Sequence, residues 1–163
     1  MNHHQKTHLL ILSTLVFLIL LLSGCDTCDR DDCFVPADPF TFRIVDKDSK
    51  EDLVFSENPR YHPDSIMLFY YQDGKEIELP LQDLTREEYY GELSNQTLPY
   101  VSAVTITKDF YLQFSFFDID TLLIDVRQVD FNCCTVFQYE TSYINGRVLK
   151  KSDDYNPVFL VEK

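Results

Sequence analysis

The chain has 163 residues, which is enough for one domain whose core needs no metal to hold it together. Its 27 acidic and 14 basic residues give a net charge of −13, which argues against nucleic acid and anionic lipid surfaces as partners. Thirteen Phe and ten Tyr with only four Gly are typical of a β-rich chain.

The N-terminus predicts a signal peptide. Residues 1–8 carry its basic character, and residues 9–22 form an uncharged apolar run broken only by Ser13 and Thr14. A membrane-spanning helix needs about 20 apolar residues. The shorter run therefore fits a cleaved signal-peptide core better than an uncleaved membrane helix.

The apolar run ends in Leu22-Ser23-Gly24-Cys25, which resembles the lipobox of bacterial lipoproteins. The resemblance implies cleavage before Cys25, a diacylglyceryl group on its thiol, and acylation, for example by palmitate, of the new N-terminus. Two or three acyl chains anchor a protein stably, whereas one chain alone is marginal. A lipid bilayer is therefore the first expected partner.

The acidic segment 26–33 is typical of a solvated tether, because four carboxylates in eight residues cannot build a core. It is similar to the acidic export signals of surface lipoproteins of Bacteroidota, although Thr27, Cys28 and Arg30 interrupt it. Asp26 directly after the cysteine is also similar to the inner-membrane retention signal of enteric bacteria. We expect the outer membrane, with exposure at the cell surface, because the rest of the chain resembles small uncharacterised lipoproteins of Bacteroidota. An inner-membrane anchor facing the periplasm is the alternative.

The expected organisation is a signal peptide (1–24), an acidic, Pro-containing tether (25–39) and one β domain (40–163). Short runs of strand-forming residues recur along the domain between turn signals: Phe40–Asp46, Leu53–Ser56, Ser65–Gln72, Lys75–Leu81, two runs within Tyr100–Phe117, one around Leu122–Val126, Cys134–Ile144, Arg147–Lys151 and Val158–Val161. This spacing predicts an all-β fold, a single immunoglobulin-like β-sandwich of about eight mostly antiparallel strands.

Three hairpin turns are expected. Asp73-Gly74 and Asn145-Gly146 have the residues that type I′ turns prefer, because both central positions need positive φ. The third turn is placed at Asp118-Ile119-Asp120. In the strand before it, the alternation predicts inward-facing Leu112, Phe114 and Phe116. An earlier strand is expected around Val104 and Ile106.

The cysteines allow several interpretations. With Cys25 lipidated, four thiols remain in an oxidising compartment, and four cysteines allow three pairings. Bonds from Cys28 and Cys33 to Cys133 and Cys134 would clamp the tether onto the domain. A Cys28–Cys33 loop and free thiols are the alternatives. A zinc site is not expected, since the adjacent Cys133 and Cys134 lack the spacing of a second ligand pair.

Other metal, cofactor or catalytic sites are not expected either. Asp46 and Asp48 have calcium-loop spacing, but Lys50 stands where a third oxygen ligand belongs. There is no Gly-x-Ser-x-Gly motif, and His62 is the single histidine after Cys25. Asp64-Ser65-Ile66 and Asp120-Thr121-Leu122 resemble O-glycosylation sites of Bacteroidota, a three-residue match only.

We therefore expect a binding or structural accessory lipoprotein that meets a protein or glycan through its loops. Arg60, Tyr61 and His62 in one loop, with Tyr89 and Tyr90 in another and Tyr100 beyond it, are the predicted partner-contacting residues. The alternative is a small hydrolase that uses His62 with carboxylates from elsewhere in the chain.

Overall fold

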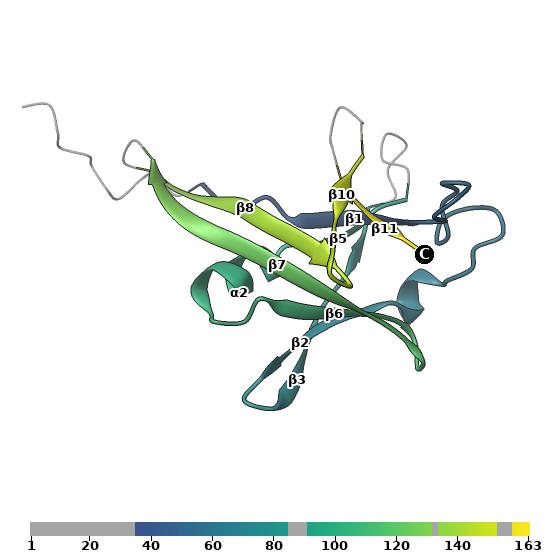
Figure 1. Ribbon diagram of the computed structural model, residues 1–163, viewed down its shortest axis with the longest axis horizontal. Coiled ribbons are helices and arrows are strands. Elements are labelled where there is room, and N and C mark those ends of the chain that lie inside the picture. Colours follow the sequence, from purple (N-terminus) through teal and green to yellow (C-terminus); the bar gives the residue numbers. More distant parts are fainter. Residues whose placement is uncertain (1–34, 85–90, 132–133, 153–157) are drawn as a thin grey trace, which may run out of the picture. The chain divides into compact units, whose positions relative to one another are not determined.

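The computed structural model describes residues 35–84, 91–131, 134–152 and 158–163, all within the second of two units into which the chain divides, 1–33 and 34–163. Figure 1 shows this part as strands with short helical elements between them. The strands are β1 (Phe40–Val45), β2 (Met67–Gln72), β3 (Lys75–Leu79), β4 (Gln82–Asp83), β5 (Leu93–Asn95), β6 (Asp109–Ser115), β7 (Asp118–Phe131), β8 (Cys134–Ile144), β9 (Arg147–Val148), β10 (Lys150–Lys151) and β11 (Phe159–Glu162). The helical elements are η1 (Pro63–Ser65) and α2 (Leu98–Val104).

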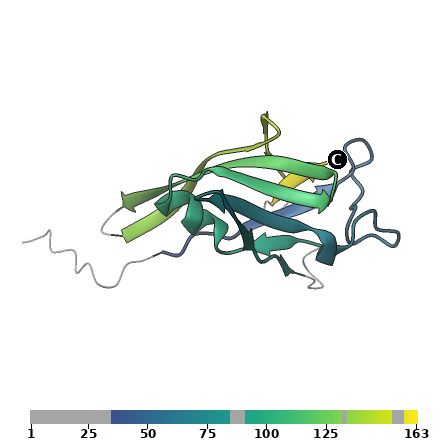
Figure 2. The same cartoon turned by 90° about the horizontal axis from the view of Figure 1, so that it is seen from below.

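The strands form two packed sheets, and the predicted all-β sandwich is confirmed. The five-stranded sheet has the order β10-β11-β1-β5-β4, and the six-stranded sheet has the order β3-β2-β6-β7-β8-β9. In Figure 2, β1 and β11 lie together beneath the β6–β7 hairpin. The core joins both sheets through side chains that are almost fully buried, among them Phe40, Phe42, Leu68, Phe110, Leu112 and Ile124. Apolar alternation, as in β1, places these side chains on the inner faces.

The described residues hold more strands than the eight expected, and three of them, β4, β9 and β10, are only two residues long. The predicted strand Arg147–Lys151 divides at the buried Leu149, so that β9 joins one sheet and β10 the other. One pair is parallel: β1 lies beside β11 with Phe42 opposite Phe159.

Two predicted turns are confirmed. Asp73 and Gly74 have φ of 52° and 74°, and Asn145 and Gly146 have φ of 48° and 73°. Both pairs therefore occupy the left-handed region that a type I′ turn needs at its two central positions. The charged turn after β1 is also present, since Oδ1 of Asp46 accepts backbone N–H bonds at 2.9 and 2.8 Å.

Two predicted strands are wrong. Residues 53–56 are bends, because the Asp52 carboxylate accepts the N–H groups of Val54 and Phe55 and folds the chain locally. The segment around Val104 belongs to α2, which begins where Asn95 Oδ1 accepts the N–H of Leu98 at 2.6 Å. One side of the helix is buried against β7, where Ser102 Oγ donates to Ile124 O at 2.7 Å.

The third hairpin turn lies two residues earlier than predicted. Asp118 to Asp120 belong to β7, and the turn between β6 and β7 consists of Phe116 and Phe117. A bulge between Gln113 and Ser115 shifts the register just before it. The expectation that Phe116 faces inward is therefore wrong, since its side chain is 79% exposed. In the described part of the chain, no helix is long and apolar enough to cross a membrane.

Candidate functional site

The hairpin tip, defined as Phe116 and Phe117, is the most exposed aromatic feature among the described residues. Phe117 is 93% exposed, and the two rings meet edge to face with centroids 4.9 Å apart. Large aromatic side chains gain most from burial, so two of them held in solvent at a turn are a candidate contact surface. The next aromatic residue inward, Phe114, is buried in the core.

A polar network lies directly beneath the tip and contains Tyr61, Asp118, Asp120, Asn145 and Lys163. Nζ of Lys163 donates to Asp118 at 2.5 Å and to Asp120 at 3.0 Å. The Tyr61 hydroxyl donates to Asp118 at 3.1 Å, and Asn145 Nδ2 donates to Asp120 at 2.7 Å. Side chains from three other segments therefore bond to the first residues of β7. These bonds hold the turn in place.

The electrostatics of the tip network favour this arrangement at neutral pH. Burial works against the charge on Lys163, but its hydrogen bonds to Asp118 and Asp120 outweigh burial and raise the pKa of the lysine. Burial, together with the neighbouring Asp118 carboxylate, raises the pKa of the Tyr61 hydroxyl. Lys163 thus stays charged and Tyr61 stays a donor. The ammonium also lies 4.1 Å from the centre of the Phe114 ring.

The predicted partner loop is only partly exposed. Tyr61 is buried at 9% exposure, with its ring 5.0 Å from Phe114, so its prediction as an exposed contact residue is wrong. Its burial follows from the hydroxyl bond that ties it to the tip network. Arg60 lies over the Tyr61 ring at 5.3 Å. Tyr100 is half-buried, packs edge to face on Phe137 and accepts the N–H of Ala37. Tyr89 and Tyr90 lie outside the described residues.

His62 precedes η1 and acts as its N-cap. Its Nδ1 accepts the N–H of Asp64 at 3.3 Å, and the side chain is 70% exposed. The neighbouring carboxylate is that of Asp64 itself, at 3.6 Å. A general base needs a second group held in a concave site. The described contacts of His62 are local and exposed, and they give the hydrolase hypothesis no support.

Two cavities in the described part of the chain border β8 and β9, with volumes of about 300 and 380 Å³. Neither is lined by a histidine or a cysteine, and each is lined by a single carboxylate, Glu140 in one and Glu162 in the other. Neither lining therefore contains a carboxylate pair. Among the residues that the structure describes, no group of His, Cys, Asp and Glu side chains is arranged to hold a metal ion.

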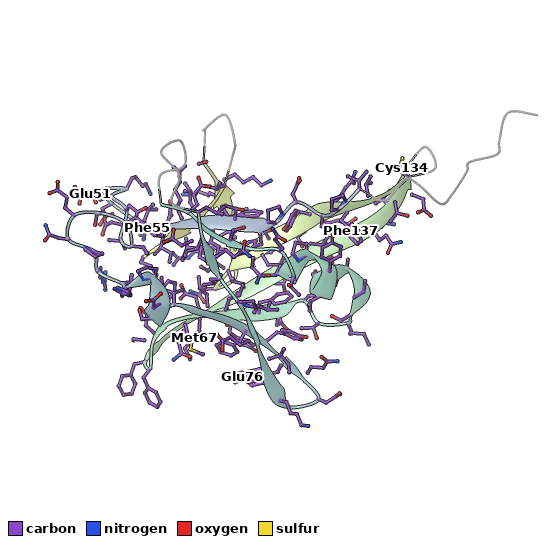
Figure 3. The ribbon with its side chains drawn as sticks, turned by 180° about the vertical axis from the view of Figure 1, so that it is seen from behind. Glu51, Phe55, Met67, Glu76, Cys134 and Phe137 are labelled. Atoms are coloured by element: carbon purple, nitrogen blue, oxygen red, sulfur yellow. The ribbon has the colours of Figure 1, made fainter. Side chains whose placement is uncertain are left out.

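The end of β7 opposite the hairpin tip pairs with Cys134, where Phe131 lies opposite it. Cys134 opens β8 and is in the disulfide-bonded form, while Cys25, Cys28, Cys33 and Cys133 lie outside the described residues. Figure 3 shows Cys134 at the far end of the β7–β8 ribbon from Met67 on β2. The described chain begins beside this end, at residue 35.

Residues 35–39, the end of the predicted tether, run along β8 and do not hang free. The N–H of Val35 donates to Thr135 O at 3.1 Å, and the Tyr139 hydroxyl donates to Asp38 O at 3.0 Å. Position 35 thus lies beside 135 and position 38 beside 139, so the two segments run in the same direction.

Sequence reasoning missed the hairpin tip and the network beneath it. Phe116 and Phe117 continue an apolar alternation that predicts burial, and the aspartates after them are typical turn residues. The available signal was the pair itself: two adjacent large aromatics cannot both face the same side of a strand. Comparisons with family models, curated proteins and solved structures find no match to this chain.

Proposed function

We propose that the chain is a lipid-anchored accessory lipoprotein that binds a protein partner through its hairpin tip. The observation that carries the proposal is the exposure of Phe116 and Phe117 above a partly buried polar network. Aromatic anchors on a rigid support are typical of the residues that dominate protein interfaces. The edge-to-face rings offer no flat platform for stacking a sugar, which favours a protein pocket over a glycan.

The anchor rests on the lipobox-like sequence ending at Cys25. Lipidation there would hold the protein at a membrane through two or three acyl chains. We propose the outer membrane, with the domain at the cell surface, and keep the periplasmic face of the inner membrane as the alternative. Protease treatment of intact cells separates the two, because a surface protein is digested and a periplasmic one is protected.

The predicted anchor is joined to the domain through residue 35, which lies near the end of β7 opposite the hairpin tip. The described chain starts beside Thr135 at the start of β8, whereas the hairpin tip precedes the other end of β7 (Figure 1). A strand of 14 residues spans roughly 45 Å at about 3.3 Å per residue. A partner would then meet the tip at a distance from the anchoring membrane.

A disulfide between the tether and the domain would fix this orientation. Cys33 precedes Val35 by two residues, and Cys134 precedes Thr135 by one. Residues 35–39 run parallel to β8, so the chain that follows Cys33 pairs with the strand that Cys134 opens. We propose Cys33 as the partner of Cys134, with Cys28 and Cys133 as alternatives. Mass spectrometry of non-reduced peptides identifies the pair.

A pull-down with matched variants tests the proposed function. Full-length protein solubilised in detergent is compared with F116S/F117S and with the control V104S/I106S. The control removes another exposed apolar pair, in which the two side chains are 69% and 99% exposed. This pair precedes the first residue of β6, whereas the tip follows the last. We expect a specific partner to be captured by the wild type and the control but lost from the tip variant. Equal capture by all three would overturn the proposal.

The anchor is tested separately with C25A, made without residues 1–24 because the unlipidated chain would otherwise keep its predicted apolar signal peptide; this protein should be found in the soluble fraction. Binding to phosphatidylcholine vesicles that is abolished in F116S/F117S and retained in C25A would assign the tip to lipid and would also overturn the protein partner.

A further inference from the structure

We propose that the 380 Å³ cavity beside β9 and β11 binds a phosphate-bearing ligand. It is lined by three cationic residues and one carboxylate, with an amide and apolar side chains completing the wall: Lys47, Arg147, Lys150, Glu162, Asn145, Ile144, Val148 and Leu160. The proposal is independent of the role assigned to the hairpin tip.

Positive charge gathers here against the trend of the whole chain. The protein carries a net charge of −13, yet the cavity lining holds Lys47, Arg147 and Lys150 with a single carboxylate, that of Glu162. A fourth cation, Lys50, comes from the same charged turn as Lys47, which also carries Asp46, Asp48 and Glu51, and pairs with Glu162 from outside the lining. Clustered like charges repel one another unless a counter-ion lies between them. A local excess of cations is therefore an arrangement that an anionic ligand would stabilise.

Glu162 acts as the internal counter-ion for two of the four cations. Its carboxylate accepts from Lys50 Nζ at 2.7 Å and from Lys150 Nζ at 3.2 Å. The hydrogen bond from Lys50, outweighing burial and reinforced by Lys150, lowers the pKa of Glu162, so this carboxylate is ionised at neutral pH. Lys50 is held further by donating to Lys47 O at 2.7 Å.

The other two cations have no ion-pair partner in the described part of the chain. Neither Lys47 nor Arg147 takes part in a described salt bridge, and both side chains are exposed at the cavity. A guanidinium and an ammonium on one wall match the oxygens of a phosphate, since arginine binds two oxygens at once and lysine adds a point charge.

The cavity is built from segments that the fold holds firmly. The turn at Asn145-Gly146 is fixed by its type I′ geometry, and Asn145 also donates to the buried Asp120. On the other side, the N–H of Lys47 donates to Lys163 O at 2.9 Å and ties the charged turn to the end of β11. The cations on these segments are thus presented by a rigid backbone, which lowers the ordering cost of binding.

The volume fits a small phosphorylated group. A cavity of 380 Å³ lies at the small end of ligand sites and has room for more than an inorganic ion. The apolar side chains of Ile144, Val148 and Leu160 would face the organic part of the ligand. A phosphorylated sugar and a phospholipid headgroup share this chemistry.

Titrations of the full-length detergent-solubilised protein with inorganic phosphate and with pyrophosphate, followed by NMR or calorimetry, test the site. We expect pyrophosphate to bind more tightly than phosphate. Binding should weaken by about tenfold or more in K47Q/R147Q, and should weaken with added salt, because the attraction is between charges at a surface. The control K75Q/R127Q removes the same charge from β3 and β7, away from the cavity, and should bind within about twofold of the wild type.

Glu162→Gln should change the affinity for pyrophosphate in the direction opposite to that expected from a non-specific loss of binding. Removing the internal counter-ion releases Lys50 and Lys150 for the ligand, so affinity for pyrophosphate should rise by about threefold or more. Weaker binding by E162Q, equal loss in the two double variants, or absence of pyrophosphate binding by the wild type would each overturn the proposal.

Binding experiments with lipid vesicles distinguish a phospholipid headgroup from a free phosphorylated compound as the ligand. Binding of C25A protein to phosphatidylglycerol vesicles that is lost in K47Q/R147Q identifies a lipid headgroup as the ligand. Pyrophosphate binding without vesicle binding identifies a free phosphorylated compound. Both results support the site and separate its occupants.

Discussion

The two ends of β7 present opposite surfaces. At the start of the strand, Phe116 and Phe117 stand in solvent above a partly buried polar network. Toward its other end, β7 exposes Arg127, Gln128 and Asp130, and Thr135 donates to Asp130 at 3.2 Å. Polarity alone therefore does not decide what this sandwich buries. In the tip network, polar side chains lie beneath the aromatic turn and the aromatic rings are exposed. At the end near Cys134, a disulfide and a backbone hydrogen bond from Val35 to Thr135 hold the chain.

The largest expected effect is at the cysteine end. Cys134→Ser removes its disulfide, and with the proposed partner Cys33 the closed loop of about 100 residues would contribute up to about 4.7 kcal/mol in the chain-entropy description. Urea unfolding without reductant should show a loss of this order. The wild type should lose a similar amount on adding reductant, whereas the variant should not respond to it. A reductant-insensitive wild type would show that this end does not depend on the bond.

Next in size is the loss of the cation beneath the tip. Lys163→Ala leaves the buried Asp120 carboxylate without its charge partner, and breaking a buried pair costs about 3 kcal/mol. Urea unfolding measures this change. The matched control Lys150→Ala removes an exposed lysine that also pairs with a carboxylate, and should stay within about 0.5 kcal/mol. Equal effects would mean that the network does not secure the tip.

The pH dependence of stability should follow the same network. The folded pKa values of Lys163 and Tyr61 are raised, so the stability they supply is fully present below their unfolded pKa values. That contribution is lost as the pH rises past about 10 and through the folded values. Urea midpoints measured between pH 8 and 11 should fall more steeply in the wild type than in Lys163→Met. Parallel curves for the two proteins would contradict the role of the lysine.

A smaller change is expected from the hydroxyl of Tyr61. Tyr61→Phe removes its hydrogen bond to Asp118 and should lower the free energy of unfolding by about 1 kcal/mol. Tyr71→Phe removes an exposed bond to Glu76 of similar length and serves as the control, with a change near zero. Thermal unfolding of both variants measures the difference. A loss of stability in Tyr71→Phe as large as that in Tyr61→Phe would argue against a special role for the network.

The smallest effect on stability is expected at the tip itself. Phe116→Ser with Phe117→Ser exposes no new core and removes two solvated rings, so stability should change by no more than about 0.5 kcal/mol. Circular dichroism during urea unfolding checks this. A large destabilisation would place the rings in the fold and would remove the reason to assign them to binding.

Local patterns predicted the parts of the fold that depend on local chemistry. The alternation of Phe40, Phe42 and Ile44 placed β1, and the Asp73-Gly74 and Asn145-Gly146 pairs placed two hairpins, because each signal is contained in a few residues. These elements together were enough for the all-β sandwich.

The candidate site depends on partners far along the chain. Asp118 and Asp120 have the residue type of a turn, but they belong to β7, where Lys163, more than 40 positions later in the sequence, binds both carboxylates. The segment around Val104 has the residues of a strand, but Asn95 binds the N–H of Leu98 at the start of a helix, and Ser102 packs that helix on β7. The bond to Asn95 is local and could have been recognised, whereas the packing of Ser102 and the bonds of Lys163 are tertiary contacts that no local pattern contains.

We propose that the anchor joins the domain near one end of β7 and that a partner binds at the other. A fluorescent non-natural amino acid is placed at position 117 or 130 of the lipidated protein, which is reconstituted into vesicles with nitroxide-labelled headgroups. We expect strong quenching at position 130 and little at position 117. Quenching at 117 equal to or greater than that at 130 would contradict this proposal.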